Sequence, residues 1–277
     1  MRRGVSLVEL VVAMAVFGIV FGLVAQAMRF QQRWQRQLQS ASAASRAARQ
    51  ATAILAAAIG DAAAADLLGA QSSDSAIELM APVASGVACV AAAELSTVAP
   101  DDTGGASRAA YAATPRAGDR VLVFDAGVRP PRWHMRSVVD LVPAVQPCTV
   151  AGTPPLGGIT LLLDSALDAP PFAAFRLQRR TRYDLYRGGD GDWYLGMREW
   201  NPQARAFNSV QPVAGPLRGF SANADRTGLR FAYFDSAGRP AVVPPDSLRV
   251  RRVTITARAA DTTAGVSQRS VVLRRVP

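Results

Sequence analysis

The sequence predicts an α+β protein in which one long N-terminal helix packs on a mainly antiparallel, β-rich globular domain. An apolar run covers residues 5–25, and apolar or small residues then recur every three or four positions up to Ile59. Segments of alternating polar and apolar residues follow from about Ser75. No proline interrupts the first part of the chain, and Gly60-Asp61 offers an end for a helix that begins near Val5.

The first half of this helix is predicted to span a membrane. The run from Val5 to Ala25 holds about 21 residues and is apolar except for Ser6 and Glu9. A secretory signal peptide ending at Ala25-Gln26-Ala27 is one interpretation, but a typical signal has an apolar region of only ~7–15 residues. A plain membrane anchor is the second, although Glu9 would cost up to ~3 kcal/mol at the bilayer centre. The third is a helix whose buried acid has a specific partner in an assembly.

The charge distribution also indicates membrane contact. The net charge is +10, and residues 1–60 carry seven arginines and one acid, whereas residues 61–277 carry 24 arginines and 20 acids. A DNA-binding domain is expected to concentrate basic residues on its fold, which is not the pattern here. Arginines instead flank the apolar run on both sides. Residues 1–4 are predicted to be cytoplasmic, because a long downstream domain is translocated whatever its charge.

The N-terminal residues Arg3-Gly4-Val5-Ser6-Leu7-Val8-Glu9-Leu10 resemble the processing site of type IV prepilins and type II secretion pseudopilins. The resemblance implies that a prepilin peptidase cuts after Gly4 and that the new terminal amine on Val5 is N-methylated. It also implies that Glu9 pairs with the terminal amine of a neighbouring subunit. A buried carboxylate needs such a cation, so a subunit without its partner is penalised. The sequence departs from the family in having Val rather than Phe as the first mature residue.

The resemblance divides the chain into a leader at 1–4, a transmembrane half-helix at 5–27, an amphipathic half-helix at 28–60 and an extracytoplasmic pilin-like domain at 61–277. The amphipathic half has an apolar stripe that is mostly Ala and Ser in its middle, which favours close packing on a sheet over a Leu-rich coiled coil. Gly18 and Gly22 form a G-x-x-x-G pair, a spacing that allows close helix approach but is also common in membrane helices by chance.

The globular part is predicted to be built from short strands. Continuous apolar runs at 121–124 and 159–163 are consistent with strands buried on both faces. A hairpin joins 175–187 to 193–200 through a Gly- and Asp-rich turn, and further strands are predicted at 229–233, 253–257 and 270–276.

The second half of the chain resembles J-type minor pseudopilins and the related W-type minor pilins. The segments that carry this resemblance are Tyr183–Arg187, Pro212–Leu217, Leu229–Asp235 with Gly238, and a final hairpin of Leu248–Ala257 with Ser270–Arg275. The resemblance implies a minor subunit near the tip of a filament, with other minor pseudopilins, a major pilin, prepilin peptidase, the inner-membrane assembly platform and a cytoplasmic ATPase as partners. A competence-type pilin that contacts DNA and a signal-anchored extracytoplasmic enzyme or binding domain are the alternatives.

Composition excludes several kinds of enzyme, and we expect no catalytic residue, cofactor or metal. The chain has no lysine, which removes phosphate-loop and Schiff-base chemistry, and its one histidine, His134, is expected to be structural. Two cysteines, Cys89 and Cys148, cannot form a four-cysteine zinc site. Outside the cytoplasm they are predicted to form a disulfide, although two free thiols are the alternative.

Two charged segments have simple structural interpretations. Asp190 and Asp192 lack the other acids of a calcium loop and are predicted to form a tight turn. The arginines of 176–187 alternate with Tyr183 and Tyr186, a combination that can bind single-stranded nucleic acid. Nearby acids favour a solvated strand face or a subunit contact instead.

Overall fold

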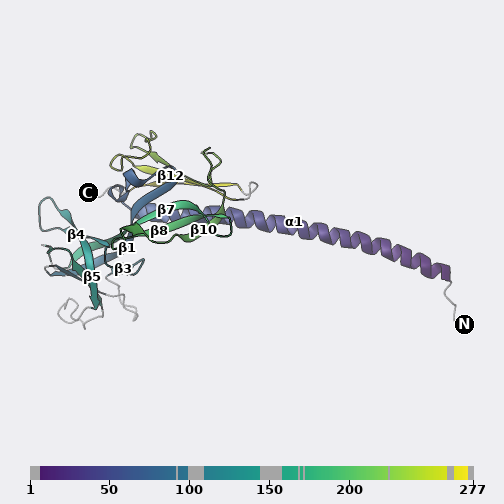
Figure 1. The fold of residues 1–277 in the computed structure, drawn as a ribbon, viewed down its shortest axis with the longest axis horizontal. Helices are drawn as coiled ribbons and strands as arrows, with labels where there is room; N and C mark the ends of the chain where they lie inside the picture. The colour runs from purple at the N-terminus through teal and green to yellow at the C-terminus, as the bar shows by residue number, and fades with distance from the viewer. Residues whose placement is uncertain are drawn as a thin grey trace.

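The computed structural model describes residues 7–91, 93–98, 109–143, 158–167, 169–170, 172–223, 225–260 and 265–273. It confirms the α+β architecture: one long helix, α1 (Leu7–Asp61), projects from a β-rich domain (Figure 1). At 1.5 Å per residue its 55 residues extend about 80 Å. The helix ends at Asp61, directly after Gly60, as the sequence predicts. Two short 3₁₀ helices, η1 (Ala64–Asp66) and η2 (Gly69–Gln71), lead into the first strand.

Every strand pairing in the described residues is antiparallel. The strands are β1 (Ala76–Ala91), β2 (Glu94–Val98), β3 (Ala109–Tyr111), β4 (Arg120–Asp125), β5 (Arg132–Pro143), β6 (Gly158–Leu163), β7 (Ala173–Arg187), β8 (Trp193–Asn201), β9 (Ala206–Phe207), β10 (Gln211–Leu217), β11 (Leu229–Phe234), β12 (Arg252–Arg258) and β13 (Val266–Val272).

The larger sheet closes on itself. β7 pairs with β1 from Ala173 to Asp184, while its other edge pairs first with β4 and then with β8. The pairings β1–β2, β2–β6, β6–β5, β5–β4 and β4–β7 complete a ring of six strands, so one part of the sheet is a small barrel. Its interior is a separate core that contains Val121, Leu161, Phe175 and Leu177. The strand pattern of the sequence does not predict this barrel.

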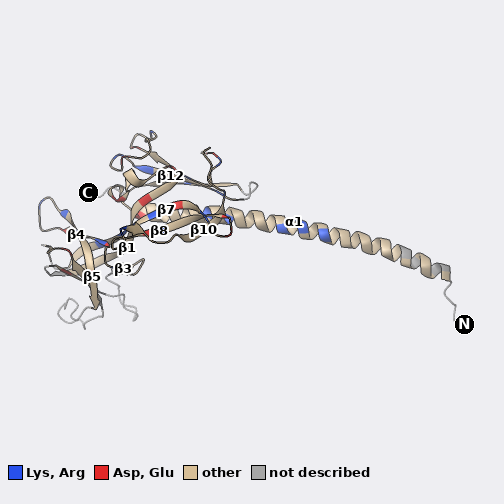
Figure 2. Ribbon diagram, in the orientation of Figure 1, with Lys and Arg blue, Asp and Glu red and all other residues tan. Residues whose placement is uncertain are grey.

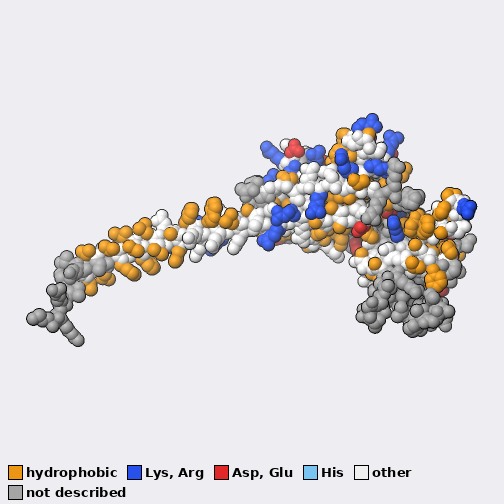
Figure 3. Space-filling view, turned by 180° about the vertical axis from the view of Figure 1, so that it is seen from behind, with side chains coloured by type: hydrophobic (Ala, Val, Ile, Leu, Met, Phe, Trp, Pro, Cys, Tyr) orange, Lys and Arg blue, Asp and Glu red, His pale blue; other side chains and the backbone are white. Residues whose placement is uncertain are grey.

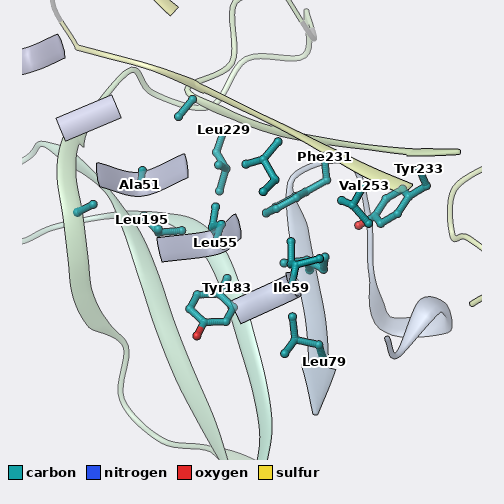
Figure 4. Close-up of a cluster of buried hydrophobic side chains, with 14 of the residues drawn as sticks. Ala51, Leu55, Ile59, Leu79, Tyr183, Leu195, Leu229, Phe231, Tyr233 and Val253 are labelled. Atoms are coloured by element: carbon teal, nitrogen blue, oxygen red, sulfur yellow. The ribbon is translucent and has the colours of Figure 1, made fainter. Parts of the chain in front are cut away.

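The second half of α1 lies between two sheets. Ala51, Leu55 and Ile59 are fully buried, or nearly so, at successive helical turns. They pack on one side against Leu195 of β8 and on the other against Phe231 of β11, together with the other side chains shown in Figure 4. Full burial of a leucine or isoleucine side chain contributes about 1.5–3 kcal/mol, so Leu55 and Ile59 hold the helix to the domain. Ala48 and Thr52, small residues of the same stripe, are also buried, which fits the expected packing on a sheet.

The predicted strands agree with the structure in part. The hairpin of β7 and β8 is confirmed, and Val253, Ile255 and Ala257 are all buried on one face of β12. The prediction that 121–124 is buried on both faces holds for one face only, because Val121 and Val123 are buried while Leu122 and Phe124 are only partly buried. The last strand begins earlier than predicted, at Val266, and residues 274–277 lie outside the described residues.

Candidate assembly site on the N-terminal helix

The first half of α1 contacts nothing else in the described chain. The helix contains the one stretch among the described residues that is long and apolar enough to cross a membrane, and none of that stretch is buried. Exposed apolar residues follow one another along the sequence, as at 10–12 and 19–21, so they point in all directions around the helix, and Figure 3 shows one side of this apolar surface. A helix that is apolar all round needs an apolar environment, which is a membrane or neighbouring helices. The arrangement therefore suits a membrane anchor that can also pack into a bundle.

A basic segment follows the apolar one. Arg29, Arg33 and Arg36 are exposed and recur at four- and three-residue steps, so they share one face of the helix. Figure 2 shows basic positions in blue on the projecting part of α1. Phe30 and Trp34 lie between them and are 69% and 56% exposed. Arginine and tryptophan at the end of an apolar span are typical of a membrane–water interface. The boundary of the span at residues 27–28 stays a prediction, and this composition is consistent with it.

Gly18 and Gly22 lie on an open part of the helix. A Cβ atom added at either glycine would meet no atom within 4 Å, so no contact inside this chain requires glycine there. Phe17 and Phe21 stack beside them with ring centroids 6.2 Å apart. A helix-packing role for the two glycines stays a prediction.

The processing residues Arg3, Gly4 and Val5 lie outside the described residues. Glu9 lies in the first turns of α1, but its side chain is also outside the described part of the chain. The comparison with protein families nevertheless bears directly on this segment: residues 1–25 match the model of the prokaryotic N-terminal methylation motif.

The chain is a type IV pilin-like protein. Three features agree in this assignment: the methylation motif, the exposed apolar half of α1 that follows it, and the helix-on-sheet domain. A pilin-like protein with this motif is a substrate of prepilin peptidase and a single-pass, membrane-anchored protein. Neither the curated proteins nor the solved structures include a match to the chain.

The one histidine, His134, contacts an acid on the neighbouring strand. His134 Nε2 lies 3.3 Å from Asp125 Oδ2 on the neighbouring strand. A backbone hydrogen bond from Gly127 lowers the pKa of Asp125, and His134 lowers it further against the opposing effect of burial. In the described part of the chain, no group of three or more His, Cys, Asp or Glu side chains could hold a metal ion. His134 therefore joins two strands, as a structural histidine does.

The Asp-rich turn also has a local explanation. Asp190 Oδ1 accepts from the Asp192 backbone N–H at 3.0 Å, and Asp190 Oδ2 accepts from the Tyr194 hydroxyl at 2.5 Å. Gly191 has φ +90, a conformation that favours glycine. These contacts close the β7–β8 hairpin.

The structure describes one of the two cysteines. Cys89, in β1, is disulfide-bonded. Cys148 lies outside the described residues. The pairing of Cys89 with Cys148 therefore stays a prediction.

The arginine run of β7 is largely paired within the chain. Arg180 Nε donates to Glu78, which is 1% exposed, and Arg180 also lies 4.3 Å from the centroid of the Trp200 ring. Arg182 Nε donates to Asp184 at 3.2 Å. The interpretation of this run as a solvated face is wrong for Arg179, which is buried.

Arg179 forms ion pairs that the sequence pattern alone does not predict. Its guanidinium donates to both oxygens of Asp119 and, at 3.0 Å, to Glu199. Burial alone would lower the pKa of Arg179, but Asp119 and Glu199 leave that pKa raised. The sequence did contain a signal for this burial. Side chains alternate between the two faces of a strand, and Arg179 lies an even number of residues from the apolar Phe175 and Leu177, so all three point to the same, buried face of β7.

Proposed function

We propose that this chain is a minor pilin or pseudopilin that prepilin peptidase processes and that enters a type II secretion pseudopilus or a type IV pilus near its tip, where it primes assembly. In this proposal it is not an enzyme. The single observation that carries it is the methylation motif at the head of a helix whose first half is fully exposed and whose second half is locked into a folded domain.

The helix supplies a simple assembly mechanism. Cleavage behind Gly4 would free an amine on Val5, four residues before Glu9. Inside a membrane the Glu9 carboxylate is costly unless a cation neutralises it. The amine of an adjacent subunit can be that cation, because two parallel helices that are offset along their axes bring the terminus of one beside Glu9 of the other. Pairing and apolar helix packing would then act together to move the subunit from the membrane into the filament.

The position of the barrel supports a place at the tip. Asp61, the last residue of α1, lines an open cleft of about 390 Å³ together with Ala84 of β1 and Arg176 of β7. The barrel core contains no residue of α1, and β4 and β5 lie at the end of the molecule farthest from the N-terminus (Figure 1). The barrel therefore projects beyond the helix, where it would obstruct a subunit stacked above it. A subunit with nothing above it has room for this domain.

The proposal also fixes location and partners. The chain would wait in the bacterial inner membrane with residues 1–4 in the cytoplasm and the β-rich domain outside. Other minor pseudopilins and a major pilin would pack along α1, and the assembly platform would move the subunit out of the membrane.

N-terminal sequencing of the membrane-extracted protein tests processing, and we expect a chain that starts at methylated Val5. A start at Met28 would mean conventional secretion instead. For assembly, Glu9→Gln should keep the chain in the membrane but prevent its co-purification with filament subunits. Asp61→Asn is the matched control, because Asp61 is an exposed acid at the other end of the same helix. Equal recovery of both variants in filaments would overturn the proposal.

A further inference from the structure

The globular domain has an uneven charge distribution. Residues 217–277 contain eleven arginines and four aspartates, whereas residues 61–216 contain 13 arginines and 16 acids. The basic segment forms the sheet of β11, β12 and β13, and arginine side chains gather along the upper side of the domain in Figure 3, where Figure 1 places β12. The three-stranded sheet is therefore the basic side of the domain.

Three arginines converge at one end of this sheet. Arg258 ends β12, and its carbonyl accepts from the backbone N–H of Arg218 at 2.9 Å. Arg230 of β11 is paired with Thr256, so Arg230 and Arg258 are diagonal neighbours on the same face. These three side chains come from the end of β10, from β11 and from β12.

The cluster is short of hydrogen-bond and charge partners. Among the described residues, Nε of Arg218 and Nε of Arg230 are buried without a hydrogen-bond partner. The counter-charge is Asp225, whose Oδ1 lies 3.6 Å from Nη1 of Arg230 and whose side chain is 85% exposed. Burial lowers the pKa of Arg258, and repulsion from Arg218 and Arg230 adds to this against the attraction of Asp225. Half-buried guanidinium groups in this condition favour an added anion.

The cluster faces the membrane side of the domain. Thr52 Oγ1 lies 2.9 Å from Ser267 Oγ, whereas Gly60, nearer the end of α1, lies beside Val271. β13 therefore starts at the level of Thr52, and the register places Arg258 opposite Val266 at that same end. In an assembly built by packing these helices, this end of the domain meets the subunit that follows.

We propose that Arg218, Arg230 and Arg258 form a binding site for a carboxylate-bearing loop of a neighbouring filament subunit. This inference rests on the proposed function. A carboxylate, Asp225, already reaches the site, and the planar guanidinium fork matches carboxylate geometry. The next arginine on this face of β12 is Arg252, six residues or about 20 Å away, so the arginines form a local site and not a continuous track for a polyanion.

The test uses the full chain in detergent and a hexaglutamate peptide as the probe. We expect the Arg230→Gln/Arg258→Gln double variant to bind the peptide about tenfold more weakly or worse, because it loses two charge-assisted contacts. Asp225→Asn should bind severalfold more tightly, because it removes the internal competitor. This second variant changes an exposed side chain, so it tests the site even if the double variant does not fold.

The matched control is Arg239→Gln/Arg249→Gln, in which both side chains are exposed and paired with local aspartates. It should change the affinity by less than about twofold, as expected for surface pairs. Equal losses in the two double variants would overturn the proposal, as would unchanged affinity in Asp225→Asn. Tighter binding of an oligothymidylate of equal charge would also overturn it and assign the site to nucleic acid. Cleavage behind Gly4 and the Glu9 experiment do not depend on this site, so the two proposals can fail separately.

Discussion

The guanidinium of Arg179 binds the carboxylate of Asp119 through two hydrogen bonds, Nε to Oδ1 at 2.7 Å and Nη2 to Oδ2 at 2.8 Å. Arg179 sits where β7 changes partners: Gln178 is the last residue paired with β4, and Thr181 is the first paired with β8. Asp119 precedes β4 and Glu199 belongs to β8, so one side chain joins the two strands that separate here. The pair fixes the barrel relative to the sheet that supports α1.

Removing Arg179 should therefore destabilise the whole domain. Arg179→Met would leave Asp119, which is 1% exposed, as a buried charge without its main partner. Loss of one member of a buried pair costs about 3–5 kcal/mol. Urea unfolding of the detergent-solubilised chain measures this loss. Arg239→Met is the control, since its side chain is 79% exposed and its loss should cost less than about 0.5 kcal/mol. Identical unfolding midpoints would contradict the assigned role of Arg179.

The β7–β8 turn should make stability fall in acid. The hydrogen bond from the Tyr194 hydroxyl lowers the pKa of Asp190 and raises the pKa of Tyr194 to about 12. A carboxyl whose pKa is lower in the folded state stabilises the fold above its unfolded pKa of about 3.9, and this contribution disappears as the pH falls through the folded value. Asp190→Asn should therefore reduce the drop in Tm below about pH 4, whereas Asp192→Asn should not. If the two variants had parallel profiles of Tm against pH, the Asp190–Tyr194 hydrogen bond would not be the cause of the loss of stability in acid.

Reduction should destabilise the barrel region if Cys89 pairs with Cys148 as predicted. Such a bond closes a loop of about 60 residues and contributes up to ~4 kcal/mol in the chain-entropy model. Thiol labelling of the unfolded chain should find no free cysteine before reduction and two after it. Cys148→Ser should make Cys89 reactive. A Cys89 that stays unreactive in Cys148→Ser would show that its partner is elsewhere.

The helix could be predicted from the sequence because its signals are local: an apolar run, a three- and four-residue stripe and a glycine at the end. The hairpin of β7 and β8 was predictable for the same reason. The barrel was not, because its closure depends on β1 and β7 pairing across about 100 residues of chain, and residues such as Ala84, Ser85 and Gly86 give β1 only a weak strand pattern. Arg179 shows the same limit, since its parity predicts burial but its partners come from distant strands.

Two leucines of α1 should separate folding from assembly. Leu55 is fully buried between the two sheets, and Leu55→Ala should cost about 2–5 kcal/mol of unfolding free energy. Leu38 is 54% exposed, and Leu38→Ala should leave that free energy nearly unchanged. In a filament, however, Leu38 would face neighbouring helices, so its loss should lower recovery of the chain in filaments. Equal destabilisation by both substitutions would mean that the segment of α1 around Leu38 is already packed in the free subunit.

The glycines of the apolar half provide the sharpest test of helix packing. Since a Cβ at Gly18 or Gly22 meets nothing within 4 Å, Gly18→Leu/Gly22→Leu should leave the stability of the domain unchanged. If neighbouring helices approach along this face, the two leucines would block that approach and the recovery of the chain in filaments should fall. Val20→Leu adds bulk on a different face of the same helix and is the control. Full recovery of the double variant would show that Gly18 and Gly22 are incidental to assembly, and a loss shared with Val20→Leu would show that bulk anywhere on the span is harmful.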